Sequence, residues 1–447
     1  MTRSRRPRAA VAVLTAVLLA LGLATSAAGA TGQVAAGNRS VVAPAAPAPT
    51  GPALAAMIAE RKRFFGAENV DPKTGALPRD EVHLVWVSVA TFAAALDGHV
   101  VLFDAYLHKA EEGKRNYVPA TTEDLIALRP KAIFLGHAHY DHGQLAGTIA
   151  AATGATIVGT QGHCDQSSAD AKRKLACVVA FGPKATFGAV KEVAVLPGVC
   201  STAVLHVHSA AEPPDPTRDP TNTAVGLPDP GTILQHPPGP STTLIAPGDE
   251  GGTVLYQIRI GHFTLTMHDS SGPLKEVAPK VFDVFRRLPK TDVQVGALVS
   301  FNNVTNGLRD PAMYIDAFNP KVFVPNHHDF VGGEYGGADD FEPKLERELK
   351  AYKARPEIRF LYDPFDYVRP GILRFDVEAP RWVDAGATPC ARLARSANAA
   401  DGSGRTAGTA KGALPTTGFG LGSGALAVLL VVTGLIGVRL ARRRARI

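Results

Sequence analysis

The sequence predicts an α/β fold, and three observations support that prediction. Short apolar runs typical of buried strands recur along the chain, between segments with the apolar spacing of helices. Asp97-Gly98 separates two strand-like runs in the manner of a hairpin turn. A cluster of histidines with one aspartate directly follows another apolar run, at residues 132–135. Interleaved strands and helices favour layers of helices packed on sheets.

Each element follows from its local pattern of residues. We expect strands at residues 82–89, 91–95, 100–103, 131–135, 155–159, 193–196, 202–207, 253–260, 263–267, 293–299, 322–324 and 358–361. Thr121 is a typical N-cap, and Glu123 and Asp124 suit the first turn of the short helix after it. We expect further helices at residues 143–150, 273–288 and 340–354.

The most informative stretch is Gly136-His137-Ala138-His139-Tyr140-Asp141-His142, between a predicted strand and a predicted helix. Residues two apart in an extended chain point the same way, so His137 and His139 can converge on one ion. The turn that follows can offer Asp141 and His142 to a second ion. Neutral imidazole and carboxylate groups are ligands that suit zinc and its neighbours.

The spacing His-x-His-x-Asp-His after a buried strand resembles the signature of the metallo-β-lactamase-fold hydrolases, over roughly residues 81–375. The resemblance implies a four-layered αββα sandwich with the metal site at one edge of the paired sheets. It also implies two divalent metal ions, for which zinc is the first choice and manganese or iron the alternatives.

Three further ligands are implied by the family's order of residues. A histidine at the end of a strand corresponds to His208, with His206 as the alternative. An aspartate that bridges two ions corresponds to Asp269, although His268 stands where the family more often has glycine. A late histidine, two residues after a proline as in the lactonase-like branch, corresponds to His327, with His328 as the alternative.

The expected ligands therefore form two sets that share one residue. The first ion takes His137, His139 and His208, the second takes Asp141, His142 and His327, and Asp269 lies between them. Three other residues are candidates for supporting roles. Asp104 ends a predicted strand near the site, His163 is a candidate pocket group, and Asp329 is a candidate for orienting a ligand imidazole.

The resemblance implies hydrolysis by a hydroxide that two ions hold at neutral pH. Asp141 is the expected catalytic residue, because it would orient the attacking water and pass on its proton. We expect a small ester, lactone or phosphoester as substrate. Two alternatives remain open: a phosphodiesterase or nuclease of the same fold, and a surface-displayed binding domain with a structural metal site.

Both ends of the chain carry targeting patterns. Residues 1–30 have a basic start, an apolar run and small residues, as in a secretory signal peptide. At the other end Leu414-Pro415-Thr416-Thr417-Gly418 is followed by the apolar run 419–438, long enough to cross a bilayer, and by five arginines.

This second pattern, residues 414–447, resembles a sortase sorting signal of Gram-positive bacteria. It implies transient membrane insertion through 419–438, cleavage after Thr417 and attachment to peptidoglycan at the cell wall. Removing the nine arginines of the two ends from the net charge of +6 leaves −3 for residues 31–417. An acidic mature chain argues against nucleic acid as a partner.

Composition also predicts the domain boundaries. Residues 31–54 form an Ala/Pro-rich leader, 55–384 the hydrolase domain, and 385–413 a small, polar spacer. Residues 209–252, within the domain, are a Pro/Gly-rich insertion that we interpret as a rim over the pocket or as an insertion without a role. Secretion favours disulfides. Cys164–Cys177 is the nearest pair in sequence, which would leave Cys200–Cys390.

Overall fold

The computed structural model describes residues 48–108, 112, 117–209, 251–298, 305–329 and 338–378. All of them belong to the first of two compact units, Met1–Ala399 and Ala400–Ile447. Within the described residues, no helix has the length and apolar character that a membrane span requires. The predicted signal peptide, spacer and sorting signal lie outside the described residues.

Two seven-stranded mixed sheets form the centre of the fold. The first sheet has the strand order β14 (Leu373–Asp376), β1 (Glu81–Ser88), β2 (Thr91–Leu96), β3 (His99–Phe103), β4 (Ala132–Phe134), β5 (Thr156–Thr160), β6 (Cys177–Phe181). The second has the order β13 (Glu357–Ile358), β12 (Val322–Asn326), β11 (Val293–Ala297), β10 (Phe263–His268), β9 (Thr253–Ile260), β8 (Cys200–His206), β7 (Val190–Val193).

The sheets pack face to face through apolar side chains. Phe134 of β4 lies 5.2 Å from Tyr256 of β9, and Phe263 of β10 lies 5.5 Å from Phe375 of β14, measured between ring centroids. Both pairs join one sheet to the other. Burial of these large rings contributes to the hydrophobic stabilisation between the sheets.

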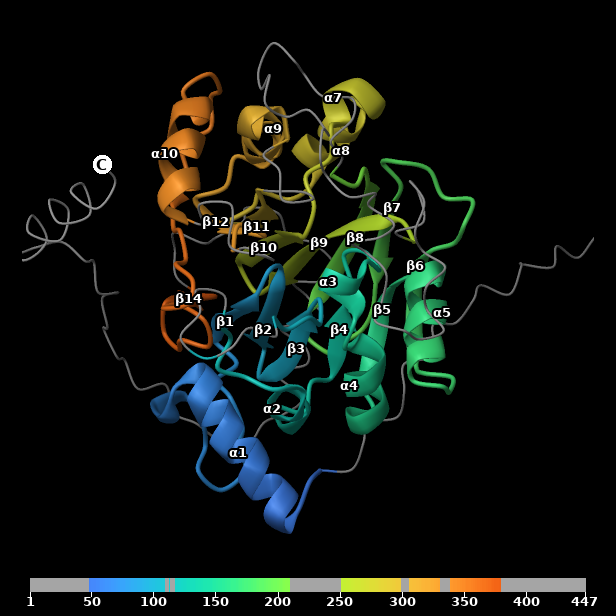
Figure 1. The fold of residues 1–447 in the computed structure, drawn as a ribbon, viewed down its shortest axis with the longest axis vertical. Helices are drawn as coiled ribbons and strands as arrows, with labels where there is room; N and C mark the ends of the chain where they lie inside the picture. The colour runs from blue at the N-terminus through green and yellow to red at the C-terminus, as the bar shows by residue number, and fades with distance from the viewer. Residues whose placement is uncertain are drawn as a thin grey trace, which may run out of the picture. The chain divides into compact units, whose positions relative to one another are not determined.

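Helices cover the outer faces of both sheets (Figure 1). Those beside the first sheet are α1 (Gly51–Phe65), α2 (Thr122–Ala127), α4 (Ala146–Thr153) and α5 (Gln161–Asp170). Those beside the second are α7 (Leu274–Val277), α8 (Val281–Arg287), α9 (Arg309–Phe318) and α10 (Ala338–Leu349). Short 3-10 turns occur at Ala67–Asn69 and Thr305–Leu308. The four-layered αββα sandwich is thereby confirmed.

Several local predictions need correction. The helix expected at 273–288 is two helices, because Ala278 precedes Pro279 and adopts φ −150°, outside the helical region. The strand expected at 193–196 instead ends at Val193. Val195 is nevertheless buried in the core from an irregular segment, which accounts for the apolar run. Helix α1 begins at Gly51, four residues before the expected start of ordered structure at 55.

Five elements carried too weak a pattern to be expected from the sequence: α1, α5, β6, α9 and β14. Helix α5 shows the difficulty, because its sequence QGHCDQSSAD is mostly polar. Its start is fixed by Thr160, whose side chain accepts a hydrogen bond from the backbone N–H of His163.

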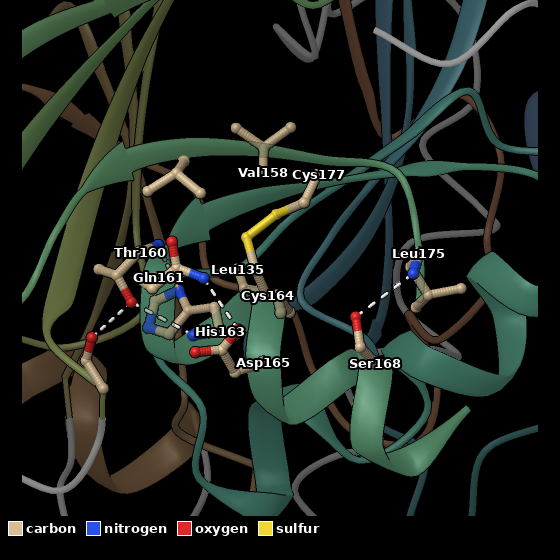
Figure 2. The surroundings of a disulfide bond; sticks show 12 residues. Leu135, Val158, Thr160, Gln161, His163, Cys164, Asp165, Ser168, Leu175 and Cys177 are labelled. Carbon is tan, nitrogen blue, oxygen red and sulfur yellow. Dashed lines mark hydrogen bonds between the residues drawn. A yellow bond between two sulfur atoms is a disulfide. The ribbon is translucent and has the colours of Figure 1, made fainter. Parts of the chain in front are cut away.

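A disulfide between Cys164 and Cys177 ties α5 to β6 (Figure 2). The pairing that sequence proximity suggested is therefore confirmed. Cys200, the first residue of β8, is also disulfide-bonded. Its expected partner, Cys390, lies outside the described residues.

Candidate metal centre

The candidate site lies where strands of both sheets end. In the first sheet β3 and β4 are parallel, and in the second β10, β11 and β12 are parallel. Strand β8 also runs in this direction, because β8 and β10 are each antiparallel to β9. Side chains that follow the carboxyl ends of these strands therefore meet at one rim, the usual place for a ligand in an α/β fold. They are Asp104, His137, His139, His208, Asp269 and His327.

The two sheets approach each other closely at this rim. The carbonyl of Gly136 accepts a hydrogen bond from the backbone N–H of Val254 in β9, at 2.7 Å. A Cβ atom at Gly136 would lie 2.1 Å from the carboxyl carbon of Asp269. Only glycine at this position leaves room for that carboxylate beside β4, so the glycine before the histidine motif is a requirement of the site.

The first group of expected ligands meets as predicted from the motif. His137, His139 and His208 each bring a ligand atom within 4.8 Å of the others. The Nε2 atoms of His137 and His208 lie 3.1 Å apart. Burial lowers the pKa of all three imidazoles, that of His208 to about 4. They are neutral at pH 7, which is the form that binds a metal ion.

The second group forms around the carboxylate of Asp141. Its Oδ2 atom lies 3.5 Å from Nε2 of His142 and 3.4 Å from Nε2 of His327. Asp141 and His142 are carried by the one-turn helix α3 (Tyr140–Gly143), where the sequence predicted a turn. The helix predicted at 143–150 begins instead at Ala146, as α4. Burial alone would raise the pKa of Asp141, but the neighbouring His142 and His327 outweigh it and hold that pKa well below its usual range.

Two buried carboxylates orient the imidazoles from behind. Nδ1 of His142 donates to Oδ2 of Asp104 at 2.9 Å, and Nδ1 of His137 donates to Oδ2 of Asp269 at 2.7 Å. Because the carboxylate holds the proton on Nδ1, Nε2 is the nitrogen of each ring that can bind a metal ion, as in the carboxylate–histidine–metal arrangements of known metal sites. Asp104 thus has the contact expected of a supporting residue.

Asp269 lies differently from the bridging position that the resemblance implied. Its Oδ2 atom contacts Nδ1 of His137 and lies 3.3 Å from Nδ1 of His142, on the side of each ring away from Nε2. Its other oxygen, Oδ1, is buried and has no hydrogen-bond partner among the described residues. Oδ1 is therefore the atom of Asp269 that remains to bind an ion.

Burial and neighbouring charges shift the pKa values of two buried groups at this edge, Asp104 and His142. Burial and the negative charge of Asp269 raise the pKa of Asp104, and the hydrogen bond from His142 opposes that rise. Burial would lower the pKa of His142, yet Asp141 and Asp104 together raise it to about 9. In the metal-free protein His142 is therefore protonated at neutral pH, and a metal ion must displace that proton.

The donor set fits divalent metal ions. The buried Oδ1 atoms of Asp141 and Asp269 have no hydrogen-bond partner in the described part of the chain, and an unsatisfied buried carboxylate oxygen is costly. The two groups of expected ligands hold five histidines, which are His137, His139, His142, His208 and His327. Imidazole and carboxylate ligands of this kind suit zinc, manganese and iron alike.

The structure distinguishes His208 from His206. Strand β8 ends at His206, so the two-residue alternation that would place both side chains on one face no longer applies at His208. Nδ1 of His206 lies 3.0 Å from the hydroxyl of Tyr314 in α9, on the helix-covered face of the second sheet. His208 is the histidine that joins His137 and His139.

His328 likewise turns away from the candidate ligands. Its ring stacks on Trp86 with centroids 5.1 Å apart, and its Nε2 atom donates to the carbonyl of Leu361 at 2.8 Å. His268 donates from Nδ1 to the carbonyl of Ser270, and its Nε2 atom accepts from the amide of Gln294. Both histidines are part of the packing around the site.

The two remaining candidates support the backbone. His163 donates from Nε2 to the carbonyl of Gly252 at 2.8 Å, and so ties α5 to the residue before β9. Asp329 accepts a hydrogen bond from the backbone N–H of Val89 at 2.8 Å and another from the hydroxyl of Tyr367. The first contact is with the turn between β1 and β2, the second is with the segment between β13 and β14, and neither is with an imidazole of the ligand set.

Sequence reasoning missed a serine cluster that joins two ligand-bearing loops. The hydroxyl of Ser270 accepts from the backbone N–H of Ser209, and the hydroxyl of Ser209 accepts from the backbone N–H of Ser271, both at 2.7 Å. Ser209 follows His208, and Ser270 follows Asp269. The only signal in the sequence was a serine directly after His208 and another directly after Asp269. Such a pattern is too common to predict that the two serines contact each other.

The chain matches no protein-family model and no curated protein. Among solved structures it is similar to Igni18, a metallo hydrolase from the archaeon Ignicoccus hospitalis, with 15% identity, 66% of this chain and 98% of that chain covered, and a TM-score of 0.42. An isothiocyanate hydrolase from Delia radicum gut bacteria has 15% identity to this chain and a TM-score of 0.39, and the match covers 62% of this chain and 95% of that chain.

CmlA, a diiron β-hydroxylase from Streptomyces venezuelae, has 11% identity, coverage of 64% of this chain and 53% of that chain, and a TM-score of 0.38. All three TM-scores are below 0.5, so we infer neither substrate nor reaction from these likenesses. The chemistry of this chain rests on its own side chains.

Proposed function

We propose that this protein is a metal-dependent hydrolase that acts on a small ester, lactone or phosphoester. The observation that carries the proposal is the convergence of seven His and Asp side chains at one rim, with a carboxylate on Nδ1 of His137 and another on Nδ1 of His142. Two adjacent groups of ligand atoms favour two ions. When bound, such ions supply Lewis acidity and lower the pKa of water.

The chain's own residues would manage the proton and the geometry. Asp141 has its Oδ2 atom between His142 and His327, and its buried Oδ1 atom is unpaired among the described residues. That second oxygen is suited to orient a reacting water and to accept its proton. Asp104 and Asp269 hold the imidazoles of His142 and His137 in one tautomer and one orientation.

The test is metal reconstitution followed by a substrate panel. The purified protein would be loaded with zinc, manganese or iron, analysed for metal content, and assayed on aryl esters, aliphatic lactones, an aryl phosphodiester and a β-lactam. His208→Ala should lose an ion and activity, whereas His262→Ala, in the turn between β9 and β10, should change neither. Absence of bound metal after reconstitution would refute the proposal.

The same assays distinguish the two alternative functions, a phosphodiesterase or nuclease and a binding domain with a structural metal site. Hydrolysis confined to the aryl phosphodiester would indicate a phosphodiesterase, and cleavage of nucleic acid in a parallel assay would indicate a nuclease. Two bound ions without turnover of any of these classes would favour a binding domain with a structural metal site.

We also propose that the protein is exported and attached to the cell wall through Thr417. The support is the order of three sequence features, the pentapeptide Leu414–Gly418, the apolar run 419–438 and the arginines after it. Mass spectrometry of wall-bound protein should find a peptide that ends at Thr417. Recovery of the intact residues 439–447 on surface protein would contradict this proposal.

A further inference from the structure

A buried carboxylate that has no place in the ligand set lies two residues after His327. The side chain of Asp329 is fully buried, and its Oδ2 atom accepts hydrogen bonds from Val89 N–H and from the hydroxyl of Tyr367. Nε2 of His108 lies 3.3 Å from the same oxygen. Two hydrogen bonds and the nearby imidazole of His108 hold this buried carboxylate.

The residue that Asp329 holds has an unusual backbone. Val89 lies in the turn between β1 and β2 with φ 51°, in the left-handed region that β-branched residues rarely adopt. Its carbonyl accepts hydrogen bonds from the backbone N–H of His327 and from Nε1 of Trp86, both at 3.0 Å. Its N–H donates to Asp329. Both polar groups of Val89 are therefore used to hold the segment 327–329.

His327 needs support because its side chain is only partly buried. Its side chain is 13% exposed, against 1% for His137 and His142. Its own backbone has φ 53°, also in the left-handed region. Such a conformation persists only where surrounding contacts fix it. The N–H of His327 has the Val89 carbonyl as its partner, and the orientation of Val89 depends in turn on Asp329.

We infer that Asp329 is a positioning residue for His327. Through the peptide groups of Val89 it fixes the backbone from which His327 reaches the carboxylate of Asp141, and so it sets the affinity for the ion of the Asp141, His142 and His327 group. Tyr367 and His108 hold Asp329 in turn. The inference rests on the proposed function, because it assumes that this group binds an ion.

The chain offers a matched control in Asp292. This carboxylate is also buried in the second sheet, and it accepts hydrogen bonds from the backbone N–H of Thr264 at 3.0 Å and from Lys321 at 2.6 Å. It stands at the start of β11, at the end of the sheet away from the ligands. Removing it should cost stability without any specific effect on metal.

The experiment compares the metal-binding curves of Asp329→Ala, Asp329→Asn and Asp292→Ala in the full chain, with zinc and with spectroscopically visible cobalt. Asp329→Ala should weaken binding of one ion by about 10- to 100-fold, the usual effect of losing an outer support, and leave the other ion unchanged. The cobalt spectrum should change only for the weakened ion. Asp329→Asn, which keeps an acceptor oxygen, should restore most of the affinity.

Equal weakening of both ions in Asp329→Ala, or the same pattern in Asp292→Ala, would overturn the inference and leave only a contribution to stability. Should Asp329→Ala fail to fold, Tyr367→Phe tests the same chain of contacts with one hydrogen bond removed. The affinity for that ion should fall by about 2- to 10-fold, the range for the loss of one hydrogen bond. Unchanged affinity would count against the inference. If the wild-type protein binds no metal, the proposed function fails instead.

Discussion

The carboxylate of Asp104 lies 2.9 Å from Nδ1 of His142, although 38 residues separate the two in the chain. Oδ1 of the same carboxylate accepts a hydrogen bond from the backbone N–H of Gly136 at 3.0 Å. Asp104 adopts φ 55°, a left-handed conformation directly after β3. One side chain thus fixes both ends of the histidine motif, its first backbone amide and its last imidazole.

Replacing Asp104 by alanine should therefore weaken metal binding. Without the carboxylate, the Nδ1 proton of His142 loses its acceptor and the ring is free to change tautomer. We expect the affinity for the ion bound by Asp141, His142 and His327 to fall about 10- to 100-fold, measured by competition with a chelating dye. Unchanged affinity would show that the ring is held by packing alone.

Asp141 and Asp269 should respond differently to substitution. Asp141→Asn keeps the size and one ligand oxygen but removes the basic site, so turnover should fall by about 10² to 10⁴ with only a modest loss of metal. Asp269→Ala should lose at least one ion, because it removes the unpaired Oδ1 and the acceptor for His137. Metal analysis beside steady-state kinetics separates these effects. Near-normal turnover of Asp141→Asn at full occupancy would contradict the role given to Asp141.

Gly136→Ala tests the close approach of the two sheets. The added Cβ would lie 2.1 Å from the carboxyl carbon of Asp269, so the carboxylate or the backbone of β4 must move. We expect a loss of about 1–3 kcal/mol in the free energy of unfolding, together with weaker metal binding.

Gly182→Ala is the matched control, because a Cβ atom at Gly182 meets nothing within 4 Å. Its stability should change by less than about 0.5 kcal/mol in urea denaturation. Similar behaviour of the two variants would show that the space beside Gly136 is not a constraint.

The stability of the metal-free protein should depend on the burial of His206. Burial lowers the pKa of this imidazole to about 3, whereas the unfolded chain has the ordinary value of about 6.5. Between these two pH values only the unfolded state takes up the proton. The contribution of the buried, neutral His206 to the free energy of unfolding is therefore complete above pH 6.5 and is lost as the pH falls towards 3. The slope is about 1.4 kcal/mol per pH unit for one proton.

His206→Gln should flatten the pH dependence of the urea midpoint by about one proton in that window. Glutamine can still form a hydrogen bond with the hydroxyl of Tyr314, which Nδ1 of His206 contacts in the wild type. An identical slope in wild type and variant would mean that His206 does not remain neutral in the folded protein.

Local residue pattern determined the layered α/β class and most strands. Alternation and turn chemistry act over a few residues, so they also indicated His137, His139, Asp141 and His142. The other candidate ligands, His208, Asp269 and His327, came from the resemblance to a known family. The motif at 137–142 needs only a strand that ends and a turn that begins, and both are written in adjacent residues. The hairpin at Asp97-Gly98 was readable for the same reason, and both residues have positive φ.

Tertiary structure alone decided which atoms face one another. His208 rather than His206 joins His137 because β8 ends at His206, two residues before His208, so alternation does not continue to His208. Asp269 contacts Nδ1 of His137 across 132 residues, and Asp329 holds Val89 across 240. Such contacts depend on how two sheets pack, and the free energy of that packing is summed over the whole core, so no local pattern of residues contains it.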